Sequence, residues 1–427
     1  MMRQIRAALL FVTAVAGLSG CSIGLTQTGQ TATTPSVAAD PEWNGTITVV
    51  TNRTDLIETK YKQYAKEFKS RYPTVTIQFE ALRDYDKNIK IRLASGETPD
   101  VMLIPLIPVA DLPKFFLPLG SLGYNPSELY FSEFKSYQGD IYGISSGVAV
   151  TGVVYNKAAF RKAGITEPPR TLDEFFAVCA KLKQIGVVPL ASNFKDRWPL
   201  QVWTSDVPLL LSGTGAIKNE MTKTDAPFQP DSPYVQSMAI LKKLYLNNYL
   251  ESNLYDTNWE LSKRDMAEGK TAMTINGNWL VNQLIENGAK PEDIGMFPFP
   301  ADNSGKPRAT LYPDRFYAVG KNTKHAAAAK AFVKWMLEQS DYEEYSGLIP
   351  VLKNRAVKLP QLQELESYRP EYVEYALDSE LYSQILNKAQ LEMPAVVQEY
   401  LLGDSEQVLD KYNKQWARIR NALRASP

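Results

Sequence analysis

The sequence predicts an α/β fold of two lobes, each built on an open mixed or parallel sheet that helices flank. Apolar segments with strand character alternate with segments of helical periodicity from Ile47 to Ile104, and the alternation resumes at Val150. About 385 residues follow the first 42, which is enough for a sizeable core and too many for one small domain. We therefore expect two lobes.

The first lobe is predicted from five segments in the order β-α-β-α-β, which indicates an open, mostly parallel sheet. The two helical segments carry apolar residues on one face, and Pro73 and Gly96 end them. The predicted strands are Ile47–Val50, Val75–Phe79 and Val101–Ile104, and the predicted helices are Leu56–Phe68 and Tyr85–Ala94.

The second lobe is predicted from a similar alternation that begins near Val148. Thr171 and Glu174 form a Thr-x-x-Glu capping box, so a helix should begin between them, and Gly186 should close it. Further predicted strands are Val150–Tyr155, Val187–Ala191, Thr271–Ile275 and Phe316–Val319; further predicted helices are Lys263–Glu268, Trp279–Glu286, His325–Glu338 and several between Leu362 and Ala425.

The N-terminus has the pattern of a secretory signal. Arg3 and Arg6 precede an apolar run from Ala7 to Leu18, which is too short to span a membrane as a helix. Leu-Ser-Gly then leads directly to Cys21 and resembles the lipobox of bacterial lipoproteins, in which this thiol receives the lipid. The alternative is an ordinary signal peptide with a chance Cys. We expect a lipid anchor at Cys21 on the outer face of a Gram-positive-type cell membrane, and a flexible tether over residues 22–42.

Composition excludes several classes of protein. Lys+Arg and Asp+Glu both number 47, so no basic field exists to attract nucleic acid. The most apolar later segment, Val101–Leu119, contains charged residues and prolines and does not read as a membrane span. Cys179 would be the only thiol after lipidation of Cys21, so no disulfide can form, and its place on an apolar helix face predicts an inert, buried side chain.

Catalytic motifs are weak in this sequence. Gly143–Gly147 matches Gly-x-Ser-x-Gly, but the following residues favour a strand, whereas the esterase elbow requires a helix there. The single histidine, His325, lies at a predicted helix start and reads as a solvated residue. Two Cys and one His cannot build a Cys/His metal site, and no phosphate loop is present. Carboxylate pairs such as Glu343-Glu344 or Asp84/Asp86 leave a glycosidase as an alternative. We expect no enzyme, no cofactor and no metal.

Four segments, in order along the chain, resemble the bacterial family 1 extracellular solute-binding proteins, to which maltose-binding protein belongs. The first is ASGETPDV at 94–101. The second comprises YGI at 142–144, YNK at 155–157, AGI at 163–165 and PPRTLDEF at 168–175. The third is GKTAMTINGNW at 269–279, and the fourth is AKAFVKW at 329–335.

The resemblance implies a periplasmic-binding-protein-like fold of type II, in which two lobes joined by three crossings close on a ligand. By analogy, we expect crossings at 147–152, 301–312 and 339–347. Lobe 1 would then contain residues 43–149 and 310–340, and lobe 2 residues 150–309 and 341–427. The family would act as a monomer that delivers a sugar to the permease subunits of an ABC transporter.

The candidate ligand-binding residues have two origins. Trp279 matches the family position at which an aromatic ring stacks on sugar, and Trp198 has a less specific counterpart; a core Trp is the alternative for Trp279. The remaining candidates follow predicted strands, because ligands bind beyond the carboxyl ends of parallel strands, or replace a Gly-rich family segment. They are Asn52, Arg53, Arg83, Asp84, Asn193, Asp196 and Asn276 in the first group, and Asp314 and Arg315 in the second.

Several alternatives stay open at this point. The ligand could be a mono- or oligosaccharide, a polyol or a uronate, and Arg53, Arg83 and Arg315 would suit an acidic sugar. The departure at Asp314 and Arg315 from the maltose-type pattern argues against maltose itself. A surface sensor or adhesion lipoprotein, or a secreted glycosidase or esterase, are the alternative functions.

Overall fold

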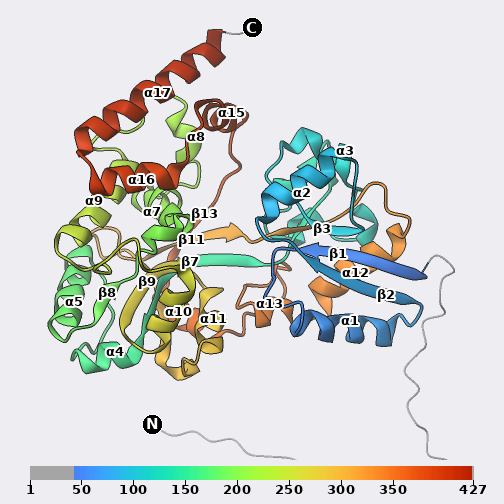
Figure 1. Cartoon of the computed structure of the whole chain (residues 1–427), viewed down its shortest axis with the longest axis horizontal. Helices are drawn as coiled ribbons and strands as arrows, with labels where there is room; N and C mark the ends of the chain where they lie inside the picture. Colours follow the sequence, from blue (N-terminus) through green and yellow to red (C-terminus); the bar gives the residue numbers. More distant parts are fainter. Residues whose placement is uncertain (1–42, 426–427) are drawn as a thin grey trace, which may run out of the picture. The chain divides into compact units, whose positions relative to one another are not determined.

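The computed structural model describes residues 43–425, which fold around two main β-sheets flanked by helices (Figure 1). The predicted α/β class is therefore confirmed. The predictions for Cys21 and for the tether over residues 22–42 lie outside the described residues. Among residues 43–425, no helix is both long enough and apolar enough to cross a bilayer.

The first sheet has the strand order β2-β1-β3-β12-β6, with β1, β2 and β3 parallel and β12 and β6 each antiparallel to its neighbour. Its strands are β1 (Gly45–Thr51), β2 (Val75–Ala81), β3 (Val101–Leu103), β6 (Ile144–Ser145) and β12 (Phe316–Val319). The chain moves outward from β1 to β2 and then back across β1 to β3. Right-handed crossovers in opposite directions put α1 and α2 on opposite faces of the sheet (Figure 1).

The helices of this first lobe are α1 (Lys60–Arg71), α2 (Tyr85–Ala94), α3 (Leu112–Phe115), α12 (Ala326–Glu338) and α13 (Tyr342–Tyr345). Tyr64 and Phe68 of α1 are fully buried and meet the rings of Phe332 and Trp335 of α12 edge-on. This aromatic layer packs a segment near the N-terminal end of the fold against one from residues 326–338, more than 250 positions later.

The second sheet has the order β13-β11-β7-β9-β8, and β10 pairs with the remaining length of β7. Its strands are β7 (Val148–Asn156), β8 (Val188–Leu190), β9 (Thr271–Gly277), β10 (Ile294–Phe297), β11 (Arg308–Pro313) and β13 (Glu371–Glu374). Every residue of β7 is buried, as expected of a central strand covered on both faces.

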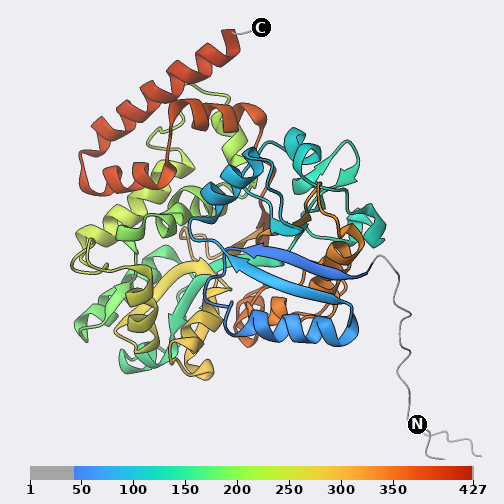
Figure 2. The same cartoon turned by 45° about the vertical axis from the view of Figure 1, so that its right-hand side comes forward.

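Helices cover both faces of this sheet and extend beyond it (Figure 2). The predicted capping box is confirmed: Thr171 and Glu174 cap α5 reciprocally. The helices are α4 (Lys157–Lys162), α5 (Leu172–Gln184), α6 (Val202–Ser205), α7 (Val207–Ser212), α8 (Ile217–Met221), α9 (Pro233–Leu246), α10 (Trp259–Ala267), α11 (Leu280–Glu286), α14 (Pro360–Ser367), α15 (Glu380–Ala389), α16 (Met393–Leu402) and α17 (Ser405–Ala425).

Short elements complete the described chain. They are the 3-10 turns η1 (Val109–Asp111), η2 (Gly120–Leu122), η3 (Pro126–Glu128), η4 (Ser132–Lys135), η5 (Phe194–Asp196), η6 (Trp198–Gln201) and η7 (Pro291–Asp293), and the hairpin of β4 (Ser136–Tyr137) and β5 (Asp140–Ile141).

The chain passes between the two sheets at three places. It leaves the first sheet after β6 and enters the second at Val148, and it returns between the end of β11 at Pro313 and the start of β12 at Phe316. The third passage follows Leu352. Ile349 forms a β-bridge with Val148 and Leu352 forms one with Leu129, and the chain then reaches α14, which packs against β10 of the second sheet.

Residues 310–313, which we expected in lobe 1, pair with β7, because Ala309 and Leu311 bury an apolar face there. Helix α13, which we expected in lobe 2, lies beside α1, because Asp341 just before it accepts from Lys60 and Tyr64.

Candidate binding site

A cavity of about 470 Å³ lies where the chain crosses between the two sheets. This volume lies within the range of small-molecule sites in proteins. Its lining combines aromatic rings with hydroxyl, amide and charged groups: Asn52, Arg53, Thr151, Trp198, Pro199, Gln201, Val202, Asp206, Asn276, Trp279, Gln283, Tyr312, Asp314, Arg315, Tyr342, Ser346, Leu348 and Tyr375.

Both sheets and the crossings contribute to this lining. Asn52 and Arg53 follow β1 of the first sheet, whereas Thr151 and Asn276 belong to β7 and β9 of the second. Further contributions come from the crossing at residues 314–315 and from the 342–348 segment around α13. A guest in the cavity would therefore touch both sheets and two connecting segments at once.

Three tryptophans form one aromatic cluster at the cavity. The ring centroids of Trp198 and Trp279 lie 6.0 Å apart, and Trp259 lies 4.8 Å from Trp198 and 5.8 Å from Trp279. Trp198 is 43% exposed, and the half-buried Trp279 also lines the cavity. Trp259 does not line the cavity and contacts the rings of both other tryptophans. The cluster offers a broad apolar face to a guest.

Gly277 permits the position of Trp279. Trp279 is the residue directly before α11, and its indole lies over Gly277, the last residue of β9. A Cβ on Gly277 would overlap the Trp279 indole nitrogen and lie 2.6 Å from the Tyr312 hydroxyl oxygen. The sequence Asn276-Gly277-Asn278-Trp279 thus lets the indole lie directly on the strand end.

Asp206 supplies a carboxylate from the junction of α6 and α7. The hydroxyls of Thr151 and Thr310 both donate to its Oδ1 over 2.7 Å. Burial raises the pKa of Asp206, and the hydrogen bonds from Thr310, Thr151 and Tyr375 lower it in turn. All of these direct partners are hydroxyl groups, so the carboxylate is held in the cavity wall without an ion pair. It can accept a further hydrogen bond from a hydroxyl-bearing guest.

The two arginines of the cavity are already paired with carboxylates. The Arg53 guanidinium donates to both oxygens of Asp55 at 2.7–3.2 Å, and Arg315 Nη1 donates to both oxygens of Asp86 at 3.0 and 3.2 Å. Asp314 accepts from the Ser146 hydroxyl over 2.7 Å. Because each guanidinium has a neutralising partner, the cavity does not require an acidic ligand.

Seven of the eleven predicted site residues line the cavity: Trp279, Trp198, Asn52, Arg53, Asn276, Asp314 and Arg315. The other four do not line it; two of them follow the edge strand β2, and two follow the edge strand β8. Arg83 and Asp84 are exposed after β2, and after β8 Asn193 is fully buried while Asp196 accepts from the backbone amide of Trp259 at the start of α10. Loops after edge strands begin farther from the crossings than loops after central strands. The sequence did not reveal which strands lie at the edges.

Sequence reasoning missed most of the second sheet's contribution. Asp206 and Tyr375 carry no motif, and Thr151 and Tyr312 lay in the expected crossings at 147–152 and 301–312 but were not named as ligand contacts; the four meet because β11 lies beside β7. Tyr342, at the start of α13, also lines the cavity, and the only signal for it was the expected crossing at 339–347.

Neither Ser145 nor Cys179, the other residues with catalytic or thiol chemistry, lines this cavity. The residues after Gly147 form β7, so Ser145 lacks the helix that a nucleophile elbow requires, and its hydroxyl donates to the Gly147 carbonyl. Cys179 is fully buried, and burial raises the pKa of its thiol. Within residues 43–425, no group of three or more His, Cys, Asp or Glu side chains is arranged to hold a metal ion.

A ligand-sized cavity at the crossings between two helix-flanked β-sheets is typical of a two-lobed binding protein. The chain belongs to the bacterial extracellular solute-binding protein family, whose model matches residues 54–342. Membership in this extracellular family indicates an extracytoplasmic location.

Three relatives illustrate the similarity. The multiple sugar-binding protein of Streptococcus mutans is 26% identical over 342 residues, which cover 77% of this chain and 80% of that protein. A manno-oligosaccharide-specific solute-binding protein from Bifidobacterium animalis subsp. lactis, solved with mannotriose, is 27% identical with a TM-score of 0.80, covering 90% of this chain and 97% of that one. An ABC transporter binding protein from the same organism, solved with mannobiose, is 27% identical with a TM-score of 0.79, covering 89% and 95%.

Proposed function

We propose that this protein captures a short, neutral oligosaccharide in the 470 Å³ cavity and presents it to the permease of an ABC importer. The observation that carries the proposal is the juxtaposition of two ligand-facing indoles, Trp198 and Trp279, with the hydroxyl-bound carboxylate of Asp206. A sugar presents an apolar C–H face and a ring of hydroxyls. The two indoles suit the apolar face, and the Asp206 carboxylate can accept hydrogen bonds from the hydroxyls.

The names of the relatives support the ligand class. Two solved structures that are 27% identical to this chain hold mannobiose and mannotriose, and a curated relative is named for multiple sugars. The pairing of Arg53 with Asp55 and of Arg315 with Asp86 favours neutral sugars over uronates. Mannobiose and mannotriose are therefore the first ligands to test.

The two sheets would act as lobes that move about the three crossings. Because the lining includes residues of both sheets and of the crossings, a bound sugar would stabilise the closed arrangement over the open one. We propose that the protein acts as a monomer without catalysis, that Cys21 carries the lipid anchor, and that a transporter is the partner. A surface sensor with the same cavity is the alternative, and a requirement for neighbouring permease genes during sugar uptake would distinguish the two.

A thermal-shift titration tests the proposed function. At a hundred times its dissociation constant, a sugar adds about 2.7 kcal/mol, which should raise Tm by about 3 °C for a fold of this size. Mannobiose, mannotriose, maltotriose and raffinose form the panel, and Trp279→Ala should abolish the shift whereas Leu246→Ala, on an exposed part of α9, should not. No shift with any sugar would contradict the proposal, and recovery of the sugar intact after prolonged incubation would separate binding from hydrolysis.

A further inference from the structure

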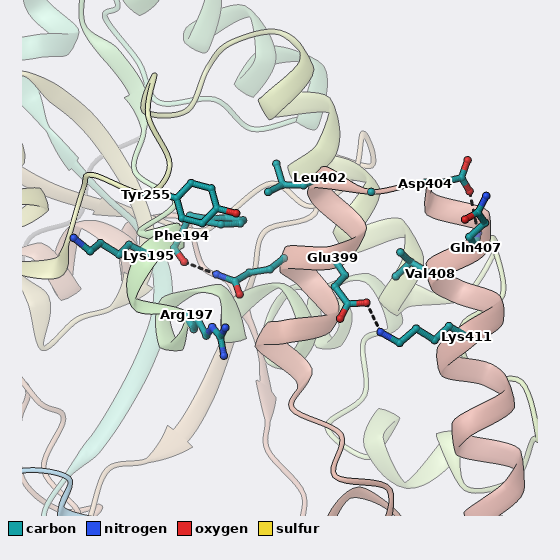
Figure 3. Close-up of a pocket in the computed structure, with 12 residues that line it drawn as sticks. Phe194, Lys195, Arg197, Tyr255, Glu399, Leu402, Asp404, Gln407, Val408 and Lys411 are labelled. Carbon is teal, nitrogen blue, oxygen red and sulfur yellow. Dashed lines mark hydrogen bonds and ion pairs between the residues drawn. The ribbon is translucent and has the colours of Figure 1, made fainter.

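A second cavity, of about 860 Å³, lies between the loop at residues 194–197 and helices α16 and α17 (Figure 3). Phe194, Lys195, Arg197 and Tyr255 line one side of it, and residues of α16 and α17 line the other. We call this cavity the outer groove. None of its lining residues belongs to the lining of the 470 Å³ cavity at the crossings.

The two cavities meet at one short segment. Phe194, Lys195 and Arg197 line the outer groove, whereas the next two residues, Trp198 and Pro199, line the cavity at the crossings. The segment therefore forms a common wall, and the outer groove begins one residue from the indole of the proposed sugar site.

The backbone of this segment is held in unusual conformations. Asn193 has φ 53° in the left-handed region, which asparagine adopts more readily than most residues, whereas Arg197 has φ 61° with ψ −50°, a conformation that residues other than glycine rarely occupy. The turn at Arg197 separates the buried Phe194 from Trp198, which is 43% exposed. Strain of this kind persists at binding sites, where the surrounding structure fixes the position of the side chains.

The outer groove offers an exposed aromatic ring. Tyr255 is 61% exposed, and its ring meets Phe194 edge-on at a centroid distance of 5.1 Å. Phe194 thus supports Tyr255 from below much as Trp259 supports Trp198 in the neighbouring cluster, where the centroid distance is 4.8 Å. The same device, an exposed ring held by a deeper one, occurs on both sides of the common wall.

The polar groups of the outer groove favour a neutral, hydroxyl-bearing guest. Among the described residues, the Lys195 ammonium and the Gln407 side-chain amide have no hydrogen-bond or ion-pair partner. Both groups can therefore form hydrogen bonds with a guest. Lys411 is neutralised by Glu399 over 2.6 Å across the gap between α16 and α17. Three cationic side chains and two carboxylates line the groove, so its charges nearly balance and it offers little field to attract an ionic ligand; they are Lys195, Arg197, Lys411, Glu399 and Asp404.

We propose that the outer groove binds the outer units of an oligosaccharide whose inner units lie in the cavity at the crossings. This inference rests on the proposed function and narrows its ligand class to chains that continue past Trp198 toward Tyr255. The adjacency along residues 194–199 of the side chains that line the two cavities, with an exposed ring beside each cavity, carries the inference.

Calorimetric titration of the full chain with manno- and malto-oligosaccharides of two to six units tests it. Affinity should rise by about tenfold, or 1.4 kcal/mol, from the trimer to the hexamer of the series that binds. Tyr255→Ala should remove this gain and leave the affinity for the dimer unchanged. Gln407→Ala, on the opposite wall, should reduce the gain in part, and Leu246→Ala should not alter it.

The outcomes separate the two proposals. If the dimer binds but affinity does not rise with chain length, or if the rise persists in Tyr255→Ala, the outer groove is no sugar subsite and the proposed function stands. If no member of either series binds, both the proposed function and this inference are contradicted. Tyr255 is largely exposed, and an unchanged Tm of the unliganded variant would show that its fold is intact.

Discussion

The indole Nε1–H of Trp279 donates to the hydroxyl oxygen of Tyr312 over 3.2 Å. This bond joins the segment after β9 to β11 of the same sheet and fixes the plane of the ring. Burial raises the pKa of Tyr312, so its hydroxyl keeps its proton at neutral pH. The hydroxyl can therefore accept from Trp279 and donate to a guest at the same time.

Gly277→Ala should weaken sugar binding by about tenfold or more, equivalent to at least 1.4 kcal/mol. The new methyl group would overlap the Trp279 indole and crowd the Tyr312 hydroxyl, so both must move. Calorimetric titration with mannotriose measures the change. Gly120→Ala is the matched control, because nothing lies within 4 Å of the position its Cβ would take. Equal affinities for the two variants would mean that Trp279 does not contact the sugar.

Asp206→Asn should lower the affinity for sugar while leaving the unliganded protein as stable as before or more so. The amide removes an anionic acceptor that the ligand hydroxyls would use, and it also removes a buried charge whose pKa burial already raises. Titration and urea unfolding measure the two effects separately. Asp231→Asn, an exposed position just before α9, serves as the control. A loss of stability without a loss of affinity would show that Asp206 is only a structural residue.

Local patterns sufficed for most of the fold. The predicted helix at Tyr85–Ala94 and the helix that starts after the capping Thr171 are confirmed, because periodicity and caps are local properties. The pattern around β11 was insufficient: Arg308–Pro313 follows a Pro- and Gly-rich passage, and its pairing with β7 becomes visible only in the sheet. β13 (Glu371–Glu374) was missed because three of its four residues are not buried.

The candidate site was predictable only where a strand end or a family motif marked it. Asn52 and Arg53 follow a central strand and line the cavity, whereas Arg83 and Asp84 follow the edge strand β2 and do not. Strand order is a non-local property, so one sequence could not separate these two pairs. Asp206 was invisible for the same reason, since two strands distant in sequence bring its threonine partners together.

Cys179 should not react with a thiol reagent in the native protein. Its side chain on α5 is fully buried, so a reagent cannot reach the sulfur. Burial also raises the pKa of the thiol, so the reactive thiolate does not form at neutral pH. A Cys21→Ser variant of the full chain isolates this residue, and a colorimetric disulfide reagent reports its reaction. We expect no release of chromophore in buffer and one equivalent in concentrated urea. Rapid reaction in buffer would contradict the burial of α5.

Glu343 should make the stability of the protein fall as pH rises from about 4.5 to about 7. The carboxylate is 3% exposed and accepts from the Val351 amide and from Arg355, both over 2.8 Å. Burial nevertheless raises its pKa from 4.5 to about 7. Below pH 4.5 the group is protonated in both the folded and unfolded states, and its stabilising contribution is fully present. As pH rises toward 7, the unfolded chain ionises first, so unfolding becomes more favourable by about 3 kcal/mol in total.

Urea unfolding of wild type and Glu343→Gln at pH 5, 6, 7 and 8 measures this contribution. Other groups also titrate over this range, so the informative quantity is the difference between the two free energies of unfolding at each pH. That difference should shift in favour of Glu343→Gln as pH rises to 7 and then level off, because the amide carries no proton to lose. Glu344→Gln is the matched control, since this neighbouring side chain is 54% exposed and pairs with Lys358 at the surface. A Glu343→Gln curve parallel to that of wild type would show that the buried carboxylate titrates near its ordinary pKa, with Arg355 compensating for its burial.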